Sequence, residues 1–187
     1  MHKTLFFAMN KLILLLAALL GLSQCKKKTV APLDQLPPAT QSGANTFGCL
    51  VNGKVYIPRG NNGMDNNVII YETAPNGANL SIRTYRYPED TKGQNKQSIS
   101  LSAGPVTKAR TFSLSLPATE GTTYYADRGQ ASPCDEFFGS AIYRKGTLTL
   151  TRVDEQAGIV SGTFEFTLAQ PGCDTIRVTN GRFDYKL

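Results

Sequence analysis

Short stretches in which apolar and polar residues alternate run through much of this chain, and they constrain its fold more than any other feature. TLTLTRV (residues 147–153) and GTFEFTL (residues 162–168) place leucine or phenylalanine at successive alternate positions. Side chains of a β-strand point alternately to its two faces, so a period of two predicts strands with one buried face. No window shows apolar residues at helical spacing over three turns. The sequence therefore predicts an all-β protein.

Asn-Gly pairs mark candidate turns between these strands. They occur at 52–53, 76–77 and 180–181, and a fourth pair at 62–63 lies in a polar run that we interpret as a loop. Both residues tolerate the positive φ that a type I′ hairpin turn requires. We expect about eight to ten antiparallel strands in a single β-sandwich or a closed β-barrel, and the pattern does not choose between the two.

Residues 1–24 have the layout of a secretory signal peptide. Lys11 precedes an apolar run from Leu12 to Leu22, and the small residue Ser23 follows. Eleven apolar residues span only about 16 Å as a helix, which is too short to cross a bilayer. Met9 begins a more compact signal than Met1 does, so the sequence leaves two candidate start sites.

The end of this segment, Leu22-Ser23-Gln24-Cys25, resembles the lipobox of bacterial lipoproteins, in which cleavage occurs before a cysteine that then carries lipid. The resemblance implies lipidation of Cys25 and attachment to a membrane, and an ordinary secreted protein is the alternative. By the same resemblance, Lys26 in place of an aspartate favours the outer membrane. The lack of acidic residues just after Cys25 favours its periplasmic face.

Residues 25–44, CKKKTVAPLDQLPPATQSGA, are rich in proline, threonine, serine and glutamine and are predicted to be a disordered tether. Residues 45–187 are predicted to form one all-β domain. The chain carries a formal charge of +6, but without residues 1–44 only 15 basic and 13 acidic residues remain. A nearly neutral domain lacks the basic face that nucleic-acid binding needs, so no nucleic-acid partner is expected.

Three cysteines remain beyond Cys25. Cys134 in SPCDEF and Cys173 in PGCDTI lie outside the predicted strands and are expected to form a disulfide in an oxidising compartment. Cys49 alternates with apolar neighbours and is predicted to be a buried free thiol, although a bridge from Cys49 to one of the others is the alternative. No C-x-x-C pair occurs, and neither a metal nor another cofactor is expected.

Few residues of this chain can do enzyme chemistry. The only histidine, His2, leaves with the signal peptide, which excludes Ser-His-Asp and Cys-His mechanisms in the mature protein. Paired carboxylates remain conceivable for glycoside hydrolysis, although turn and cap roles are favoured for them. The candidates are Asp127, Asp135, Glu136 and Asp174. Glu165 and Asp184 fall on outward strand phases and are predicted to be solvated. We therefore do not expect an enzyme.

Tyrosines offer a candidate binding patch. Tyr85 and Tyr87 share one strand phase, and Tyr124 and Tyr125 lie in a turn-rich region. If these four side chains are exposed together, they form an aromatic surface for a ligand. Packing in the core or at the end of a barrel is favoured for them over this role.

Three stretches carry a resemblance to a known family: TFGCLVNGKVYIP early in the domain, and SGTFEFTL and DTIRVTNGRFDYKL at its end. They resemble a family of uncharacterised Bacteroidota lipoproteins that is defined only as a domain of unknown function. GTFEF and TNGRFD are the distinctive parts, and the similarity covers residues 46–187 or so. It implies an envelope β-domain and supplies no catalytic residues.

Together these features predict a lipid-anchored cell-envelope protein that binds a ligand or partner, such as an envelope protein or a glycan, without enzymatic activity. A structural envelope component that binds no small ligand is the first alternative. A carboxylate-dependent glycoside hydrolase is the second.

Overall fold

The structure is a computed structural model that describes residues 30–61, 63–88, 95–117 and 119–187. The predicted signal peptide, Cys25 and residues 26–29 of the predicted tether lie outside these residues. Within them, no helix has the length and hydrophobicity that crossing a membrane requires.

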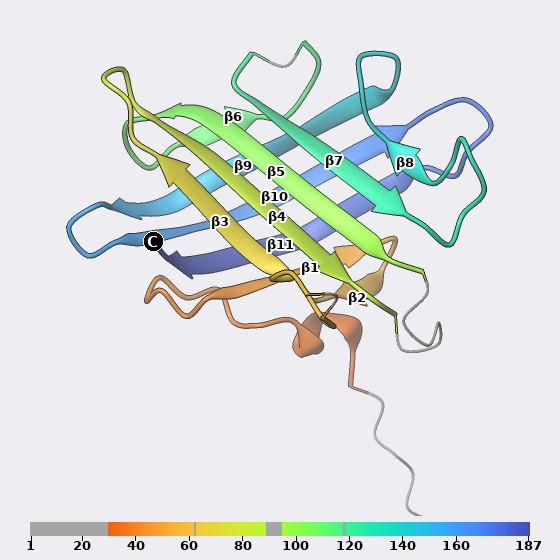
Figure 1. Cartoon of the computed structure of the whole chain (residues 1–187), viewed down its shortest axis with the longest axis horizontal. Helices are drawn as coiled ribbons and strands as arrows, with labels where there is room; N and C mark the ends of the chain where they lie inside the picture. The colour runs from red at the N-terminus through yellow and green to blue at the C-terminus, as the bar shows by residue number, and fades with distance from the viewer. Residues whose placement is uncertain (1–29, 62, 89–94, 118) are drawn as a thin grey trace, which may run out of the picture. The chain divides into compact units, whose positions relative to one another are not determined.

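Two antiparallel sheets face one another (Figure 1). The first has the strand order β2-β1-β11-β10-β9-β6 and comprises β1 (Thr46–Val51), β2 (Lys54–Tyr56), β6 (Thr111–Ser113), β9 (Tyr143–Asp154), β10 (Ile159–Ala169) and β11 (Ile176–Lys186). The second has the order β3-β4-β5-β7-β8 and comprises β3 (Asn67–Glu72), β4 (Ala78–Arg86), β5 (Gln97–Val106), β7 (Gly121–Asp127) and β8 (Glu136–Phe137). The sheets remain separate, so the β-sandwich is confirmed and the closed barrel is wrong.

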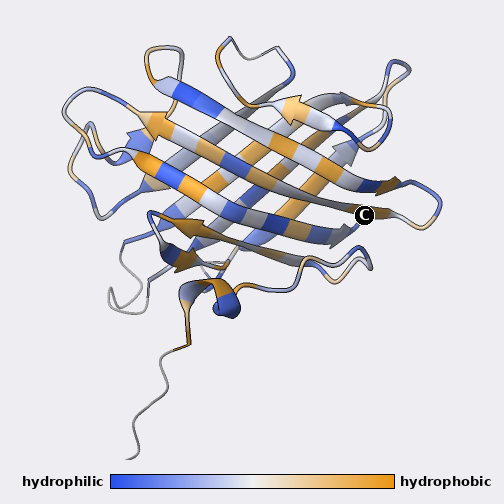
Figure 2. Ribbon diagram, turned by 180° about the vertical axis from the view of Figure 1, so that it is seen from behind, coloured by the Kyte–Doolittle hydropathy of each residue, from blue (hydrophilic) through white to orange (hydrophobic). Residues whose placement is uncertain are grey.

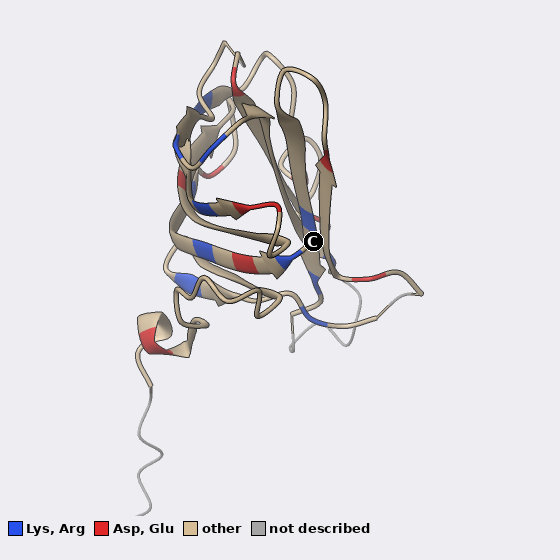
Figure 3. Cartoon of the chain, turned by 90° about the vertical axis from the view of Figure 1, so that its left-hand side faces the viewer, with Lys and Arg blue, Asp and Glu red and all other residues tan. Residues whose placement is uncertain are grey.

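Alternating side chains fill the space between the sheets. Apolar and polar residues alternate along the long strands, as the coloured ribbon in Figure 2 shows. Phe47 of β1 stacks on Phe164 of β10 with ring centroids 5.0 Å apart, and Phe166 and Phe183 are buried beside them. In the side view of Figure 3, basic and acidic residues are interspersed over both layers. The alternation at residues 147–153 and 162–168 therefore predicted β9 and β10 correctly.

Asn-Gly pairs have two different roles in this fold. Asn52 and Gly53, with φ of 47° and 77°, form the two-residue turn between β1 and β2, as predicted. The pair at 180–181 instead lies inside β11, where Asn180 has φ of 53° and the pairing with β10 shifts register, as in a β-bulge. Gly181 is required there because a Cβ would lie 2.5 Å from the Phe164 carbonyl oxygen. The prediction of a hairpin turn at this pair is wrong.

Residues 31–44 pack on the first sheet. They begin with a single 3₁₀ turn, η1 (Pro32–Gln35), and the next side chain, Leu36, is buried. Pro37 packs so closely on β1 that a Cβ at Gly48 would lie 2.6 Å from its Cδ. The predicted disorder is therefore wrong for these residues, and the compact unit begins at Ala31 instead of Asn45.

One carboxylate holds this N-terminal segment in place. Asp184 points outward from β11, yet only 1% of it is exposed because residues 40–44 cover it. It accepts hydrogen bonds from Thr40 Oγ1 (2.6 Å), Ser42 N (2.9 Å) and Oγ (3.2 Å), Gly43 N (2.8 Å), Ala44 N (3.2 Å) and Ser161 Oγ (2.7 Å). Burial by itself raises the pKa of Asp184, but these hydrogen bonds outweigh it and hold the pKa far below its usual range. The prediction that Asp184 is solvated is wrong, whereas Glu165 is exposed as expected.

Cys49 is a free, fully buried thiol in the core, as the alternation around it predicted. Burial raises its pKa strongly, with a smaller opposing effect of Arg86. Thiolate is the reactive form of cysteine. We therefore expect Cys49 to resist maleimide labelling in the folded full-length protein. In urea without reductant, its labelling should be complete within minutes. Intact mass spectrometry would measure this, and rapid labelling of the folded protein would show that Cys49 is accessible.

Candidate functional site

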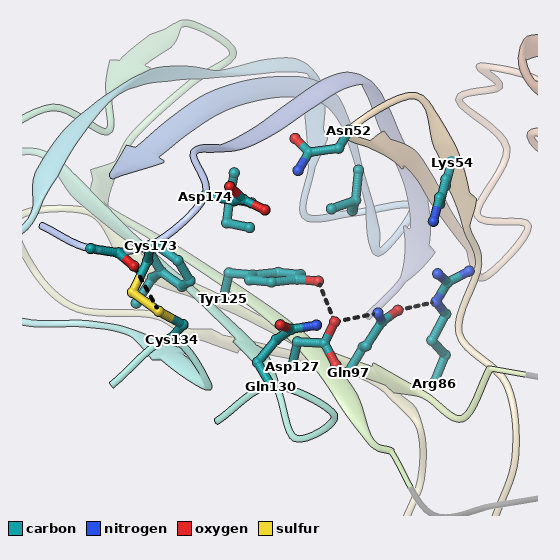
Figure 4. Close-up of a pocket in the computed structure, with 14 residues that line it drawn as sticks. Asn52, Lys54, Arg86, Gln97, Tyr125, Asp127, Gln130, Cys134, Cys173 and Asp174 are labelled. Atoms are coloured by element: carbon teal, nitrogen blue, oxygen red, sulfur yellow. Dashed lines mark hydrogen bonds between the residues drawn. A yellow bond between two sulfur atoms is a disulfide. The ribbon is translucent and has the colours of Figure 1, made fainter. Parts of the chain in front are cut away.

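A cavity of about 460 Å³ opens at one end of the sandwich, between the two sheets (Figure 4). The first sheet and its loops contribute Val51, Asn52, Lys54, Gly172, Cys173, Asp174 and Ile176. The second sheet and its loops contribute Arg86, Gln97, Tyr125, Asp127, Gln130, Cys134 and Phe137. Its volume lies within the range of roughly 300–1,000 Å³ that is typical of small-molecule sites.

A chain of hydrogen bonds crosses the floor of this cavity. Arg86, Gln97 and Asp127 are direct partners on the neighbouring strands β4, β5 and β7, so their side chains lie on one face. Arg86 Nε donates to Gln97 Oε1 (2.7 Å), and Gln97 Nε2 donates to Asp127 Oδ2 (2.8 Å). Tyr125 donates its hydroxyl to the same carboxylate oxygen at 3.5 Å. The strand register thus positions the Arg86 guanidinium and the Asp127 carboxylate with the Gln97 side-chain amide between them.

Arg86 is held from three sides. Besides Gln97, it donates to the carbonyl oxygen of Val55 in β2, and its guanidinium carbon lies 5.0 Å from the ring centroid of Tyr56. No carboxylate of the described residues forms an ion pair with it. Its charge is therefore positioned by the fold and is not neutralised by a carboxylate of the described residues.

Of the four charged residues that line the cavity, Lys54 and Asp174 are the two whose side chains have no partner among the described residues. Both side chains are exposed, and neither forms a hydrogen bond or ion pair with another described residue. Lys54 follows the Asn52-Gly53 turn, beside the strand position that Arg86 binds, and Asp174 follows Cys173. Figure 4 shows Lys54 and Arg86 at one end of the cavity and Asp174 with the disulfide at the other.

Tyr125 supplies a neutral hydroxyl between these ends. Burial raises its pKa well above the usual tyrosine range, and the nearby Asp127 carboxylate raises it further. The phenol therefore stays protonated at neutral pH and acts as a hydrogen-bond donor.

The disulfide forms part of the cavity wall. Cys134, in the loop between β7 and β8, is bonded to Cys173, in the loop between β10 and β11, with Cα atoms 5.4 Å apart. Gln170 reinforces this wall by donating to the carbonyl oxygens of Pro133 (2.5 Å) and Glu136 (3.2 Å). The predicted pairing is confirmed, and it ties a loop of one sheet to a loop of the other.

The four candidate acids divide into two groups. Asp127 and Asp174 line the cavity, whereas Asp135 and Glu136 form ion pairs with Arg128 outside it. Asp127 also accepts a bond from the backbone N–H of Gly129 (3.1 Å), as the favoured turn role predicts. Among the described residues, no three His, Cys, Asp or Glu side chains gather as a metal site would require.

The four candidate tyrosines do not form one exposed patch, so the condition for an aromatic binding surface is not met. Tyr85 lies on the outer face of the second sheet but is only 5% exposed. Tyr87 packs edge-on against its ring, and the Lys96 amine lies 4.5 Å from the ring centroid. The Tyr85 hydroxyl donates a hydrogen bond to the Met64 carbonyl oxygen (2.5 Å). Tyr124 packs on Phe138. Tyr125, the next residue, points to the opposite face, as alternation demands, and alone of the four lines the cavity.

Sequence reasoning missed Lys54, Arg86 and Gln97. Arg86 left a usable signal, because it continues the inward phase of Leu80, Ile82 and Thr84 in β4 and so places a charge where an apolar residue is the rule. Lys54 and Gln97 gave none, because their importance depends on which strands pair.

Comparison with known proteins adds no relative. A scan of protein-family models, a search of curated proteins and a search of solved structures each found no match to this chain.

Proposed function

We propose that this protein is a non-enzymatic binding module of the bacterial cell envelope, anchored by lipid on Cys25 to the periplasmic face of the outer membrane, and that it binds a small polar ligand in the cavity at the end of the sandwich. One observation carries the binding role. Lys54, Arg86 and Asp174 line an open cavity, and none of them is in an ion pair with a described residue.

The chemistry of the cavity supports binding over hydrolysis. Retaining and inverting glycosidases need two free carboxyl groups: one protonates the leaving oxygen, and the other attacks the sugar or activates a water molecule. Asp127 instead accepts hydrogen bonds from Gln97, Gly129 and Tyr125, so both of its carboxylate oxygens are engaged by the protein. Among the residues that line the cavity, Asp174 therefore has no second free carboxylate with which to form a catalytic pair.

The anchor is supported by the sequence around Cys25. Lysines directly after Cys25 favour an anionic membrane surface by roughly 1 kcal/mol each. Only residues 26–30 separate Cys25 from the compact unit, and five residues reach at most about 18 Å. A protein anchored in this way holds its binding domain close to the membrane.

Replacing Cys25 with serine is expected to release the protein from the membrane fraction, because no cysteine remains for acylation at the predicted cleavage site. Membrane fractionation and intact mass of the extracted wild-type protein would test this, with Cys49→Ala as the matched cysteine control that keeps the anchor. A wild-type chain without acyl chains would contradict the proposed attachment.

Binding is tested by nuclear magnetic resonance on the full chain in detergent micelles, with pools of monosaccharides, short peptides and muropeptide fragments. We expect at least one pool to shift the amide signals of Asn52, Gln97 and Asp174, and the Lys54→Met/Asp174→Asn variant to reduce these shifts. If no pool affects them, the structural envelope role is favoured instead. If a pool is chemically converted during the titration, the non-enzymatic assignment is wrong.

A further inference from the structure

The charges of the cavity are separated along its length. Arg86 and Lys54 lie at the end formed by β2 and β4, and Arg86 binds the carbonyl next to Lys54 in the chain. Asp174 lies at the other end, beside the disulfide (Figure 4). The cavity thus has a basic end and an acidic end.

Asp127 does not cancel this separation. Gln97 lies between it and Arg86, and the carboxylate is engaged by three donors on the floor. Two cations and two carboxylates line the cavity, so its formal charge is balanced overall. A ligand of high net charge, such as a polyphosphate, meets repulsion from one end, whereas a ligand with one charge of each sign fits both.

The walls between the two ends suit a short polar chain better than a sugar ring. Tyr125 and Phe137 are 3% and 1% exposed, so neither offers an aromatic face on which a pyranose can stack. Gln130 is exposed at the rim, and its side-chain amide makes no hydrogen bond with another described residue. An amide of this kind both donates to and accepts from peptide groups.

We infer that the ligand class is a small zwitterion with a free carboxylate and a free primary amine, such as a short unblocked peptide. The carboxylate binds Lys54 and Arg86, and the ammonium group binds Asp174. This inference rests on the proposed binding function and specifies the ligand of the same site.

The test compares three peptides. Triglycine carries both charges, N-acetyltriglycine carries only the carboxylate, and triglycine amide carries only the ammonium group. Affinity for the full chain in micelles would be measured by calorimetry at low ionic strength, where charge pairs are least screened. We expect triglycine to bind about tenfold more tightly than either blocked peptide, since each charge-assisted contact contributes on the order of 1.5 kcal/mol.

Two variants assign the ends of the cavity. Lys54→Met should remove most of the advantage of a free carboxylate and keep that of a free amine, and Asp174→Asn should do the reverse. Both side chains are exposed, so the fold is retained. Lys108→Met and Asp34→Asn, exposed residues that do not line the cavity, are the matched controls and should leave all three affinities unchanged.

The outcomes separate this inference from the proposed function. Equal affinity for the three peptides, or equal losses in both variants for every peptide, overturns the zwitterion. A monosaccharide that shifts the amide signals of the cavity while triglycine does not also overturns it, but keeps the binding function. If neither peptides nor sugars bind, both proposals fail.

Discussion

Replacing Asp184 with alanine is expected to lower the free energy of unfolding by about 3–5 kcal/mol. The substitution removes a buried carboxylate that accepts six hydrogen bonds from five residues, and three of the donors are backbone N–H groups of residues 42–44. Without the carboxylate, residues 31–44 lose their attachment to β11 and part of the first sheet becomes uncovered. Urea unfolding followed by circular dichroism would measure the loss.

The pH dependence of the free energy of unfolding tests this prediction. The pKa of Asp184 is depressed in the folded state, so its stabilisation is complete above the unfolded value of about 3.9 and declines as the pH falls below it. The difference between wild type and Asp184→Asn should therefore be largest near neutral pH and shrink below pH 4 or so. Asp34→Ala, an exposed residue of η1, should change stability by less than about 0.5 kcal/mol. A pH-independent difference would contradict the role assigned to the charge.

Replacing both Cys134 and Cys173 with serine is expected to lower the free energy of unfolding by roughly 3–4 kcal/mol. The two residues are 39 positions apart, and opening a loop of this length restores about 4 kcal/mol of chain entropy to the unfolded state. The loops that the bond joins belong to different sheets, so the cavity wall should also loosen and triglycine affinity should fall.

Reduction supplies the control for the disulfide. Wild-type protein in reductant should unfold at the same urea concentration as the double variant, and the variant itself should not respond to reductant. Cys49 takes no part, because it is buried and unpaired. A loss below about 1 kcal/mol would show that the reduced, unfolded chain retains structure in this region.

The fold was largely predictable because alternation is a local property. β9 and β10 follow from their own residues, and so does the buried position of Cys49. The bulge at Asn180 was not predictable, because a residue with positive φ suits a hairpin turn and a bulge equally well. The order of residues 31–44 was missed for a different reason, since the group that fixes this polar segment lies about 140 positions away.

The candidate site was predictable only in part. Asp127 and Asp174 were candidates because they lie near the loop cysteines in the chain, and the disulfide brings those loops together. The basic end depends on β4 pairing with β5 and on β2 facing Arg86 across the gap between sheets. Neither the pairing of β4 with β5 nor the contact of β2 with Arg86 can be read from the sequence, because several strand orders satisfy the same alternation of apolar and polar residues.

The hydrogen bonds by which Asp184 holds residues 40–44 have a mechanical consequence if the chain is anchored through Cys25 as proposed. Force on the proposed anchor at Cys25 would reach residues 31–44 before it reaches the ladder of β1 and β11, which pairs Thr46 with Asp184. This segment has no strand pairing of its own, so it detaches first and adds 14 residues, or roughly 50 Å, of slack. In a protein anchored as proposed, the sandwich would keep its fold under a force that first releases this segment.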